Sequence, residues 1–317
     1  MVVKKLKFRI LITGGCGFIG SYLVRRLVNL GYNVVILDNL AKGNMITNLR
    51  DIANNVRLVK GDIREYETVL KASKDVDVIF HLAALTDIQE SIEKPRLYHE
   101  VNSTGTLNLL QASVENKVEK FVYTSSCAVY GNPVKLPISE EHPTNSLSPY
   151  AASKLSAENY CKAYSNSYGL KVLILRLFNV YGPRQTKSYA GVVSEFIRRV
   201  MDGKLPVIFG DGEQTRDFIY VDDVVEYLVK ALNYEPKNGF EVFNVGTGKP
   251  ITINQLADLV LKMVGKENLK PVYEKPKEGE IKHSVANIVK TVNHLNYVPQ
   301  YTLEEGLRRI LASNLVT

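Results

Sequence analysis

The sequence predicts an α/β protein, with a doubly wound parallel sheet and a smaller mixed α/β region toward the C-terminus. Short, continuously apolar runs alternate with stretches whose apolar residues recur at helical spacing. Continuous apolar runs are typical of strands covered on both faces, and their alternation with helices indicates right-handed βαβ crossovers. A glycine-rich turn follows the first strand, at the end of the sheet where such folds bind ligands.

The predicted elements follow one another regularly up to about residue 178. Strands are predicted at 7–13, 33–38, 56–62, 77–83, 120–126, 171–177 and 239–246. Helices are predicted at 18–30, 67–72, 96–116, 151–168, 192–203, 221–233, 253–265 and 303–313. From this pattern we expect a Rossmann-type domain of residues 1–178 plus about 217–245, and a second domain of about 179–216 plus 246–317.

The bulk composition narrows the class of protein. The net charge of +7 comes from interspersed residues, so it favours anionic small-molecule substrates and does not predict nucleic-acid binding. No stretch approaches the roughly 20 apolar residues that span a bilayer, so we expect no membrane association. The three cysteines, Cys16, Cys127 and Cys161, form no metal-ligand spacing, and their odd number suits a reducing compartment. We therefore expect a cytoplasmic protein without a metal site.

A phosphate-binding turn is predicted at 13–20, which reads TGGCGFIG. Gly14, Gly17 and Gly20 stand between a predicted strand and a predicted helix. Glycine lets the backbone approach a pyrophosphate, and the helix N-terminus offers free N–H groups. A plain tight turn is the alternative, but the strand before and the helix after it favour a dinucleotide site.

Asp38 ends the second predicted strand. A carboxylate there accepts hydrogen bonds from a ribose diol and repels a 2′-phosphate, which favours NAD over NADP. Neither Cys16 nor Asn39 is an arginine that would bind a 2′-phosphate. The alternative is a solvated turn aspartate.

Three residues form a candidate catalytic group. Tyr150 and Lys154 lie four residues apart at a predicted helix start marked by Pro149, so they share one face of the helix. A nearby ammonium lowers the pKa of a phenol, which can then exchange a proton with a substrate hydroxyl. Ser126 ends the fifth predicted strand and can bridge the tyrosine and the substrate. Taken singly, Tyr150 and Lys154 could also be an ordinary surface pair, and Ser126 could only cap the end of its strand.

Together, these segments resemble the extended short-chain dehydrogenase/reductase family over essentially the whole chain. The matching motifs are TGGCGFIG, GDIR, HLAAL, SSCAVYG, PYAASK, LRLFNVYGPRQ, RDFIYVDDVV and GEIKHSVANIVK. The family's 4,6-dehydratases carry an Asp-Glu pair where this chain has Cys127 and Ala128, so the segment resembles the family's epimerases. The resemblance implies reversible 4-epimerisation of a UDP-hexose by transient hydride transfer to tightly bound NAD through a 4-keto intermediate.

The resemblance assigns the chemistry to Tyr150, which takes the proton of the sugar's 4-hydroxyl while Ser126 assists and Lys154 tunes Tyr150. It makes the first domain the NAD-binding domain and the second the sugar-nucleotide-binding domain. The implied cofactor contacts are Gly14, Gly17, Phe18, Ile19, Gly20, Asp38, Asn39, Asp62, Ile63, Leu82, Ala83, Ala84, Asn102, Tyr150, Lys154 and Phe178.

The same likeness implies contacts to the substrate. Asn179, Arg216 and Lys277 correspond to the residues that bind the diphosphate. Lys277 replaces the usual arginine, so it keeps the charge but loses the fork that grips phosphate at two places. Val207 and Phe209 resemble the wall around the uracil, with core packing as an equal alternative.

Ser284 corresponds to a position at the edge of the sugar pocket. A small residue there leaves room for an acetamido group, which implies activity on UDP-N-acetylhexosamines besides UDP-glucose and UDP-galactose. A cap for the helix expected after it is an equal alternative.

Two other functions are also compatible with the sequence. An enzyme acting on UDP-glucuronate or a dTDP-sugar is one, although Thr186 stands where uronate epimerases tend to carry an arginine. A dinucleotide-sensing regulator without catalysis is the other, although both Tyr150 and Lys154 are retained. The resemblance also implies a homodimer, in which helices at about 98–116 and 150–168 pair across a two-fold axis.

Overall fold

The computed structural model describes residues 8–41, 48–185, 191–276 and 281–313. The chain forms two compact units. The first contains Met1–Ser126, Ser148–Arg176 and Val225–Phe243. The second contains Cys127–Leu147, Leu177–Val224 and Asn244–Thr317.

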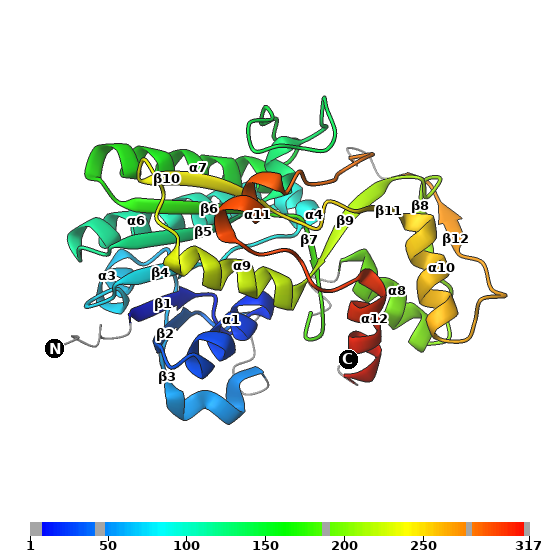
Figure 1. Cartoon of the computed structure of the whole chain (residues 1–317), viewed down its shortest axis with the longest axis horizontal. Coiled ribbons are helices and arrows are strands. Elements are labelled where there is room, and N and C mark those ends of the chain that lie inside the picture. The colour runs from blue at the N-terminus through cyan, green and yellow to red at the C-terminus, as the bar shows by residue number, and fades with distance from the viewer. Residues whose placement is uncertain (1–7, 42–47, 186–190, 277–280, 314–317) are drawn as a thin grey trace. The chain divides into compact units, whose positions relative to one another are not determined.

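A seven-stranded sheet forms the centre of the first unit (Figure 1). Its strands are β1 (Arg9–Thr13), β2 (Asn33–Asp38), β3 (Val56–Lys60), β4 (Val78–His81), β5 (Lys120–Ser126), β6 (Lys171–Leu177) and β10 (Phe240–Val245). Their order in space is β10-β6-β5-β4-β1-β2-β3, and the pairs β1–β2, β2–β3, β1–β4 and β4–β5 are parallel. The chain order reverses between β1 and β4, and the carboxyl ends of the strands at such a point are where doubly wound folds bind ligands.

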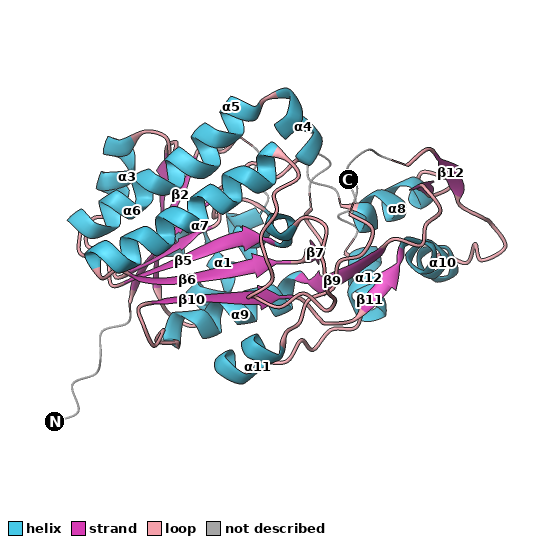
Figure 2. Ribbon diagram, turned by 90° about the horizontal axis from the view of Figure 1, so that it is seen from above, coloured by secondary structure: helices cyan, strands magenta, loops and turns pink. Residues whose placement is uncertain are grey.

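Helices cover both faces of this sheet. They are α1 (Phe18–Asn29), α3 (Tyr66–Ala72), α4 (Ile88–Glu93), α5 (Pro95–Tyr98), α6 (Gly105–Glu115), α7 (Pro149–Tyr168) and α9 (Val221–Asn233). Figure 2 shows α3, α6 and α7 on one side of the sheet and α9 on the other. The core on the first side joins Leu11, Ile79 and Phe121 of the strands to Leu109 of α6 and Ala157 of α7. The apolar runs of the sequence are therefore strands covered on both faces, as predicted.

Two features of this unit position functional groups. Ser148 caps α7, since its side chain accepts a hydrogen bond from the Ala151 N–H, and Pro149 occupies the first turn. A π-helical stretch, His99–Thr104, joins α5 to α6. Such a stretch changes the direction in which its side chains point and is frequent at functional sites.

The described part of the second unit contains small sheets and four α-helices besides the start of α9. A three-stranded sheet has the order β11-β9-β7, and a two-stranded sheet pairs β12 with β8. The strands are β7 (Asn179–Tyr181), β8 (Val207–Phe209), β9 (Thr215–Tyr220), β11 (Pro250–Thr252) and β12 (Val272–Glu274). The helices are α8 (Val192–Met201), α10 (Ile253–Met263), α11 (Val289–Leu295) and α12 (Leu303–Ala312). Thr252 and Thr302 begin α10 and α12 with capping boxes, in which side chain and backbone satisfy one another's hydrogen bonds.

The predicted fold class is confirmed, because the seven-stranded parallel sheet flanked by helices and a smaller C-terminal region are both present. The predicted domain bounds differ from the units at several places: residues 127–147, 177–178, 217–224 and 244–245 were expected in the first domain and belong to the second unit. The assignment of one domain to NAD and the other to the sugar nucleotide stays a prediction.

Candidate functional site

The predicted phosphate turn lies between β1 and α1. Gly14 has a φ of 69°, and a Cβ there would come within 2.8 Å of the backbone of Ala83. A Cβ at Gly20 would lie 2.1 Å from the oxygen of Gly14, so α1 packs directly on the turn. A Cβ at Gly17, in contrast, would meet only the Gly14 oxygen, at 3.2 Å, among the described residues. No side chain caps α1, so the open side of Gly17 and the first N–H groups of the helix fit a pyrophosphate.

Phe18 and Ile19 form the first turn of α1, directly after this open side. Both are only partly buried. The structure therefore places them beside the turn, where the resemblance puts cofactor contacts.

Asp38 lies buried at the carboxyl end of β2, and its carboxylate is fixed at both oxygens. Oδ2 accepts a hydrogen bond from the Cys16 N–H at 3.0 Å, and Oδ1 accepts one from the Leu40 N–H at 2.8 Å. Burial, with a further effect from Asp38, raises the pKa of the Cys16 thiol to about 12, so this thiol is neutral. Each oxygen of Asp38 keeps lone-pair capacity for a ribose hydroxyl.

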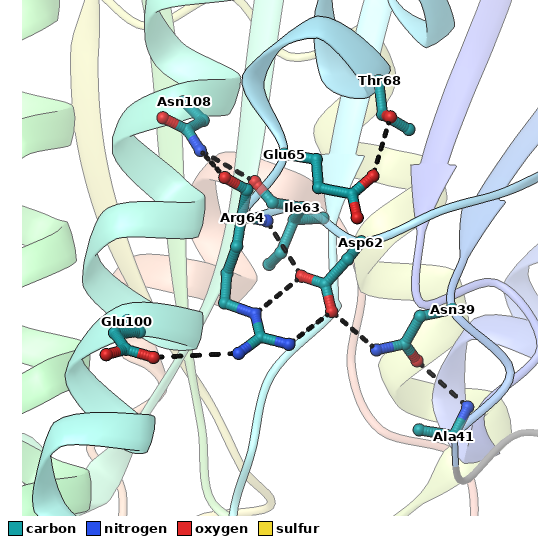
Figure 3. Close-up of polar contacts among 9 residues, drawn as sticks. All are labelled: Asn39, Ala41, Asp62, Ile63, Arg64, Glu65, Thr68, Glu100 and Asn108. Atoms are coloured by element: carbon teal, nitrogen blue, oxygen red, sulfur yellow. Dashed lines mark hydrogen bonds and ion pairs between the residues drawn. The ribbon is translucent and has the colours of Figure 1, made fainter.

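A second carboxylate, Asp62, follows β3 at the same end of the sheet (Figure 3). Its oxygens accept hydrogen bonds from the Arg64 N–H at 2.9 Å, from Arg64 Nε at 3.0 Å and Nη2 at 2.9 Å, and from Asn39 Nδ2 at 3.1 Å. Arg64 also lies 3.7 Å from Glu100. The side-chain hydrogen bonds from Arg64 are the main cause that lowers the pKa of Asp62 to about 2.

These contacts bear on the predicted contact of Asp62 with the cofactor. Asp62 already accepts four hydrogen bonds, which matches the capacity of a carboxylate. An adenine amino group that binds Asp62 must therefore replace one of them, and the exposed Asn39 is the nearest exchangeable donor. The neighbouring Ile63 is buried and its carbonyl accepts from Asn108 at 3.0 Å, which fixes the loop.

The end of β4 is organised by a buried imidazole. His81 forms hydrogen bonds with the hydroxyl groups of Thr13, at 2.7 Å, and Thr106, at 2.9 Å. Burial, together with the charge of Lys154, lowers the pKa of His81 well below its usual value, so the ring is neutral. The Thr13 hydroxyl in turn accepts from the Ala83 N–H at 3.2 Å. His81 thus holds the 82–84 segment, which contains the predicted cofactor contacts Leu82, Ala83 and Ala84, against the phosphate turn.

Asn102 lies in the π-helical stretch, and its side-chain amide forms hydrogen bonds with other parts of the protein. Its Oδ1 accepts from the Leu85 N–H at 2.9 Å, and its Nδ2 donates to the Leu85 carbonyl at 2.9 Å and to Ser153 Oγ at 2.9 Å. Since both amide hydrogens are used, the geometry favours a role in which Asn102 fixes the segment after β4 to α7. Direct contact with the cofactor stays a prediction.

The structure brings the predicted catalytic residues to one end of the first unit. Tyr150 and Lys154 lie on the buried face of α7, and Lys154 Nζ donates to the Thr124 carbonyl at 2.6 Å. Thr124 lies on β5, two residues before Ser126, which ends the strand. The ammonium is also 4.4 Å from the centre of the Tyr123 ring, and the ring of Tyr150 packs edge-on against Tyr98.

The charge of Lys154 is balanced between two opposing effects. Burial lowers the pKa of its ammonium to about 7, while the negative charge of Glu158 raises it. Glu158 lies one helical turn further along α7 and forms a buried ion pair with Arg176 of β6, at 2.7 Å. Lys154 therefore titrates near neutral pH, where a change in its charge changes the stability of a neighbouring phenolate.

The second unit contains the predicted diphosphate residues. Asn179 begins β7, and its Nδ2 donates to the Asp217 carbonyl of β9 at 3.1 Å. Arg216, next to Asp217, donates to the Thr215 carbonyl at 2.9 Å and to the Lys282 carbonyl at 3.3 Å. Asn179 and Arg216 thus lie on adjacent strands, held by backbone contacts.

Asp217 joins three segments around these residues. Its buried carboxylate accepts from the N–H groups of Thr247 at 2.8 Å, Gly248 at 2.9 Å and Ala286 at 3.1 Å, and from the Thr247 hydroxyl at 2.6 Å. Burial raises the pKa of Asp217 above its usual value, and these hydrogen bonds oppose the shift. Asp217 therefore fixes the backbone beside Arg216 and the backbone that follows Ser284.

Ser284 is buried, and its N–H donates to the Thr215 carbonyl at 3.1 Å. The Cys127 thiol forms a hydrogen bond with Ser284, and burial raises its pKa to about 11. The alternative role of Ser284 as a helix cap is wrong, because α11 begins at Val289 and the residue at its cap position is Ile288. A cap must directly precede the first helical residue, and Ser284 lies too far upstream.

Val207 and Phe209 lie on β8, on either side of Ile208. Ile208 is buried, whereas Val207 and Phe209 are only partly buried. Alternate residues of a strand point to opposite faces, so Ile208 belongs to the core and the other two line the opposite face. This arrangement favours a binding wall over core packing for both.

Phe178 and Lys277 are the two remaining predicted contacts. Phe178 is buried between β6 and β7, and its N–H donates to the Val245 carbonyl at 2.9 Å. Lys277 lies outside the described residues, as does Thr186.

Three residues of the site, Thr124, Glu158 and Asp217, were not predicted from the sequence. Thr124 acts through a backbone carbonyl, which no side-chain motif reports. Glu158 had a detectable signal, since it lies four residues after Lys154 in a predicted helix and therefore shares its face. Asp217 is adjacent to Arg216 in a matching motif, but its partners come from distant parts of the chain.

Within residues 8–41, 48–185, 191–276 and 281–313, no group of three or more His, Cys, Asp or Glu side chains is arranged to hold a metal ion. None of the helices in those ranges is long and apolar enough to cross a membrane.

The chain is similar to known proteins of one family. Residues 10–246 match the family model of the NAD dependent epimerase/dehydratase family. The chain is 40% identical to a UDP-glucose 4-epimerase of Mycolicibacterium smegmatis, and the match covers 95% of this chain and 96% of that protein.

Solved structures agree over almost the whole chain. A crystal structure of UDP-glucose 4-epimerase from Thermotoga maritima with UDP-glucose matches with a TM-score of 0.91 and 36% identity, over 97% of this chain and 99% of that one. A UDP-N-acetylglucosamine 4-epimerase from Methanobrevibacter ruminantium, in complex with UDP-N-acetylmuramic acid, matches with a TM-score of 0.90 and 35% identity, over the same shares. Relatives at 33% and 34% identity are a UDP-glucuronate 4-epimerase of Thermodesulfobacterium geofontis and a UDP-N-acetyl-alpha-D-glucosaminuronate decarboxylase of Bacillus cytotoxicus, each matched over at least 94% of both chains.

Proposed function

The chain belongs to the NAD-dependent epimerase/dehydratase family, and we propose that it is a UDP-hexose 4-epimerase with NAD as its cofactor. The observation that carries this proposal is the buried Tyr150–Lys154 pair, whose ammonium is bound at Thr124 beside the strand end that carries Ser126. The same unit contains the glycine turn and Asp38, which fit a dinucleotide with a free ribose 2′-hydroxyl. Cys127 and Ala128 stand in place of the acid pair that a dehydratase requires to expel water.

In the proposed reaction, this chain moves one proton to and from the substrate. Tyr150 accepts the proton of the sugar's 4-hydroxyl and later returns it to the oxygen of the 4-keto sugar. The Lys154 ammonium stabilises the phenolate form of Tyr150, and Ser126 donates a hydrogen bond to the reacting oxygen. Bound NAD supplies the acceptor, and then the donor, of the hydride at carbon 4.

Other residues bind and orient. Asp38 binds the adenosine ribose diol, and the first turn of α1 binds the pyrophosphate of NAD. Asn179 and Arg216 bind the diphosphate of the UDP-sugar, and Arg216 supplies the charged fork suited to it. Val207 and Phe209 form the wall beside the uracil.

The sugar range extends to N-acetylhexosamines in this proposal. Ser284 is small, and its position in the family borders the 2-substituent of the sugar. A related structure is a UDP-N-acetylglucosamine 4-epimerase, which supports this wider range. The proposed homodimer and the cytoplasmic location stay predictions.

A single panel of substrates tests the proposal. Purified protein is incubated with UDP-glucose, UDP-galactose, their two N-acetyl analogues, UDP-glucuronate and dTDP-glucose, and the products are separated chromatographically. We expect interconversion of both hexose pairs, approached from either side. Conversion of UDP-glucuronate alone would make the chain a uronate enzyme, and NAD binding without any turnover would make it a dinucleotide sensor.

A further inference from the structure

One face of α7 carries three polar side chains in a row. Tyr150, Lys154 and Glu158 are spaced by four residues, so they lie above one another on the helix. All three are buried, with exposed fractions of 7%, 3% and 4%. Charged side chains are rarely buried to this extent unless they are paired, so the third member of the row needs an explanation.

Glu158 is held rigidly by Arg176 of β6. Nε of Arg176 donates to Oε1 at 3.0 Å, and Nη2 donates to Oε2 at 2.7 Å. This two-point contact fixes the plane of the carboxylate, and Arg176 is itself buried, with an exposed fraction of 6%. A buried pair of this kind is weak evidence for added stability, since desolvation offsets much of the attraction.

Glu158 is the acid that acts on Lys154. Among the described residues, Glu158 and Cys161 of α7, His81 of β4 and Tyr123 of β5 interact with the Lys154 ammonium, and Tyr150 lies one turn before it on the same helix face. Burial keeps Cys161, Tyr123 and His81 neutral, since it raises the pKa of the first two and lowers that of the third. The Thr124 carbonyl binds the ammonium but carries no net charge.

We propose that Glu158 is a positioning residue for the proton-transfer pair. Its carboxylate, fixed by Arg176, keeps the Lys154 ammonium charged and bound at Thr124, where it stabilises the phenolate of Tyr150. The expected effect of Glu158 on turnover rests on the proposed function. The expected effect of Glu158 on the charge of Lys154 does not. A purely structural role, in which the ion pair only joins α7 to β6, is the competing explanation.

The test measures the charge of Lys154 directly. Protein saturated with NAD and labelled with 13C at the lysine ε-carbon is titrated by NMR, and Lys154→Met assigns the signal. The wild-type midpoint is expected at about 7. Glu158→Gln should lower it by about one pH unit or more, because at an effective dielectric constant of about 20 a charge within about 12 Å contributes at least about 1.4 kcal/mol. Glu158→Asp, which keeps the charge, should restore most of the shift.

Controls separate positioning from stability. Glu235→Gln removes a carboxylate that pairs with Lys120 and Lys171, and it should leave the Lys154 midpoint unchanged. If Glu158→Gln does not fold, because it leaves a charged Arg176 buried, Glu158→Gln/Arg176→Gln replaces the ion pair by two amides. It should also lower the midpoint, but by less than Glu158→Gln, because the positive charge of Arg176 is removed as well. An unchanged midpoint in the folded variants, with only a lower melting temperature, would establish the structural role and overturn the inference.

Turnover gives the second readout. In Glu158→Gln, a midpoint lower by one unit reduces the charged fraction of Lys154 above pH 7 about tenfold, so epimerisation there should fall by a similar factor and recover toward lower pH. An active wild type whose pH profile is unchanged in Glu158→Gln would overturn the inference and leave the proposed function intact. If the wild type has no epimerase activity, but Glu158→Gln still lowers the Lys154 midpoint, the proposed function is wrong and the electrostatic role of Glu158 is supported.

Discussion

At the scale of single residues, the proposed chemistry depends on the Lys154 ammonium, which the fold removes from water. Lys154 is buried, binds the Thr124 carbonyl and lies against the Tyr123 ring. Burial lowers its pKa to about 7, so its charge is sensitive to every neighbouring group. Tyr150, one turn earlier on the same helix face, depends on that charge for its proposed exchange of a proton.

Replacement of Tyr150 by Phe tests the proton transfer. The ring is kept and the phenol is lost, so turnover should fall by about 10² to 10⁴, the usual contribution of a general acid–base. NAD affinity should remain close to that of the wild type. Steady-state rates and calorimetric titration with NAD measure the two quantities, and near-normal turnover would show that another group moves the proton.

The pH dependence of stability tests the buried charge of Lys154. Its pKa is about 7 in the folded chain and 10.5 in the unfolded chain, so between these values the unfolded chain holds a proton that the folded chain has released. The free energy of unfolding should therefore rise with pH across this window, by up to about 1.4 kcal/mol per pH unit from this group.

Urea unfolding of the wild type and of Lys154→Met at several pH values isolates this effect, because other titrating groups contribute equally to both. As the pH rises, the free energy of unfolding of the wild type should increase relative to that of Lys154→Met. Parallel curves would mean that Lys154 keeps its ordinary pKa in the folded state.

Ser284 tests the sugar range. Ser284→Tyr should reduce catalytic efficiency on UDP-N-acetylhexosamines by about tenfold or more relative to UDP-glucose and UDP-galactose, because a phenol ring fills the space of an acetamido group. Ser284→Ala, which stays small, is the matched control and should keep the ratio. An unchanged ratio in Ser284→Tyr would show that this position does not border the 2-substituent.

Residues that form motifs are recognisable in the sequence, whereas residues that act through distant partners are not. Gly14, Gly17 and Gly20 share one turn and Tyr150 and Lys154 share one helix, so spacing along the chain sets the relation within each group. Glu158 meets Arg176 across 18 residues, and Asp217 meets Ala286 across 69. Such pairs depend on how strands and helices pack, which local patterns do not specify.

At the scale of elements, helix α1 and the turn before it form one structural piece. The close contact between Gly20 and the Gly14 oxygen sets the distance between the helix and the sheet. The first N–H groups of α1 are therefore held at the place where a pyrophosphate would bind.

Gly20→Ala tests that contact. The added methyl group would lie 2.1 Å from the Gly14 oxygen, so α1 must move away from the turn. We expect a loss of about 1–3 kcal/mol in stability and at least about a tenfold loss in NAD affinity, since overpacking shifts the backbone. Gly265→Ala, at a left-handed position with open space around it, should cost stability but leave NAD affinity unchanged. Equal NAD affinities in all three proteins would show that the helix position does not limit binding.

The long helices and strands were predictable from the sequence, whereas the three-residue strands were not. The strands of the seven-stranded sheet have long apolar runs, and the longer helices show clear periodicity. β7, β8, β11 and β12 have three residues each, too few for a period of two to be distinguished from chance. Each is fixed by its pairing partner in the folded unit.

At the scale of the whole molecule, the chain passes repeatedly between its two units. The first unit is built from three separate segments, and so is the second. Cofactor binding to the first unit should nevertheless be visible in the unfolding of the protein, because a ligand that binds only the folded state stabilises it.

Thermal unfolding therefore tests the choice of cofactor. Protein stripped of nucleotide should gain about 2.7 kcal/mol of stability at an NAD concentration of 100 times its dissociation constant. NADP at the same concentration should give much less, because its 2′-phosphate would meet the fixed carboxylate of Asp38. Asp38→Gly should reduce this difference. Equal stabilisation of the wild type by the two cofactors would contradict the assignment of Asp38.

The position of β10 at one edge of the seven-stranded sheet has a consequence for synthesis on the ribosome. β6 ends at Leu177, but its outer neighbour begins only at Phe240. At about 5–20 residues per second, the ribosome needs several seconds to make the intervening chain. During that interval the apolar strand KVLILRL has an unpaired edge, which is a template for aggregation. Nascent chains of this protein should therefore need chaperone protection most when they are about 180 to 240 residues long, and fragments that stop before β10 should be insoluble.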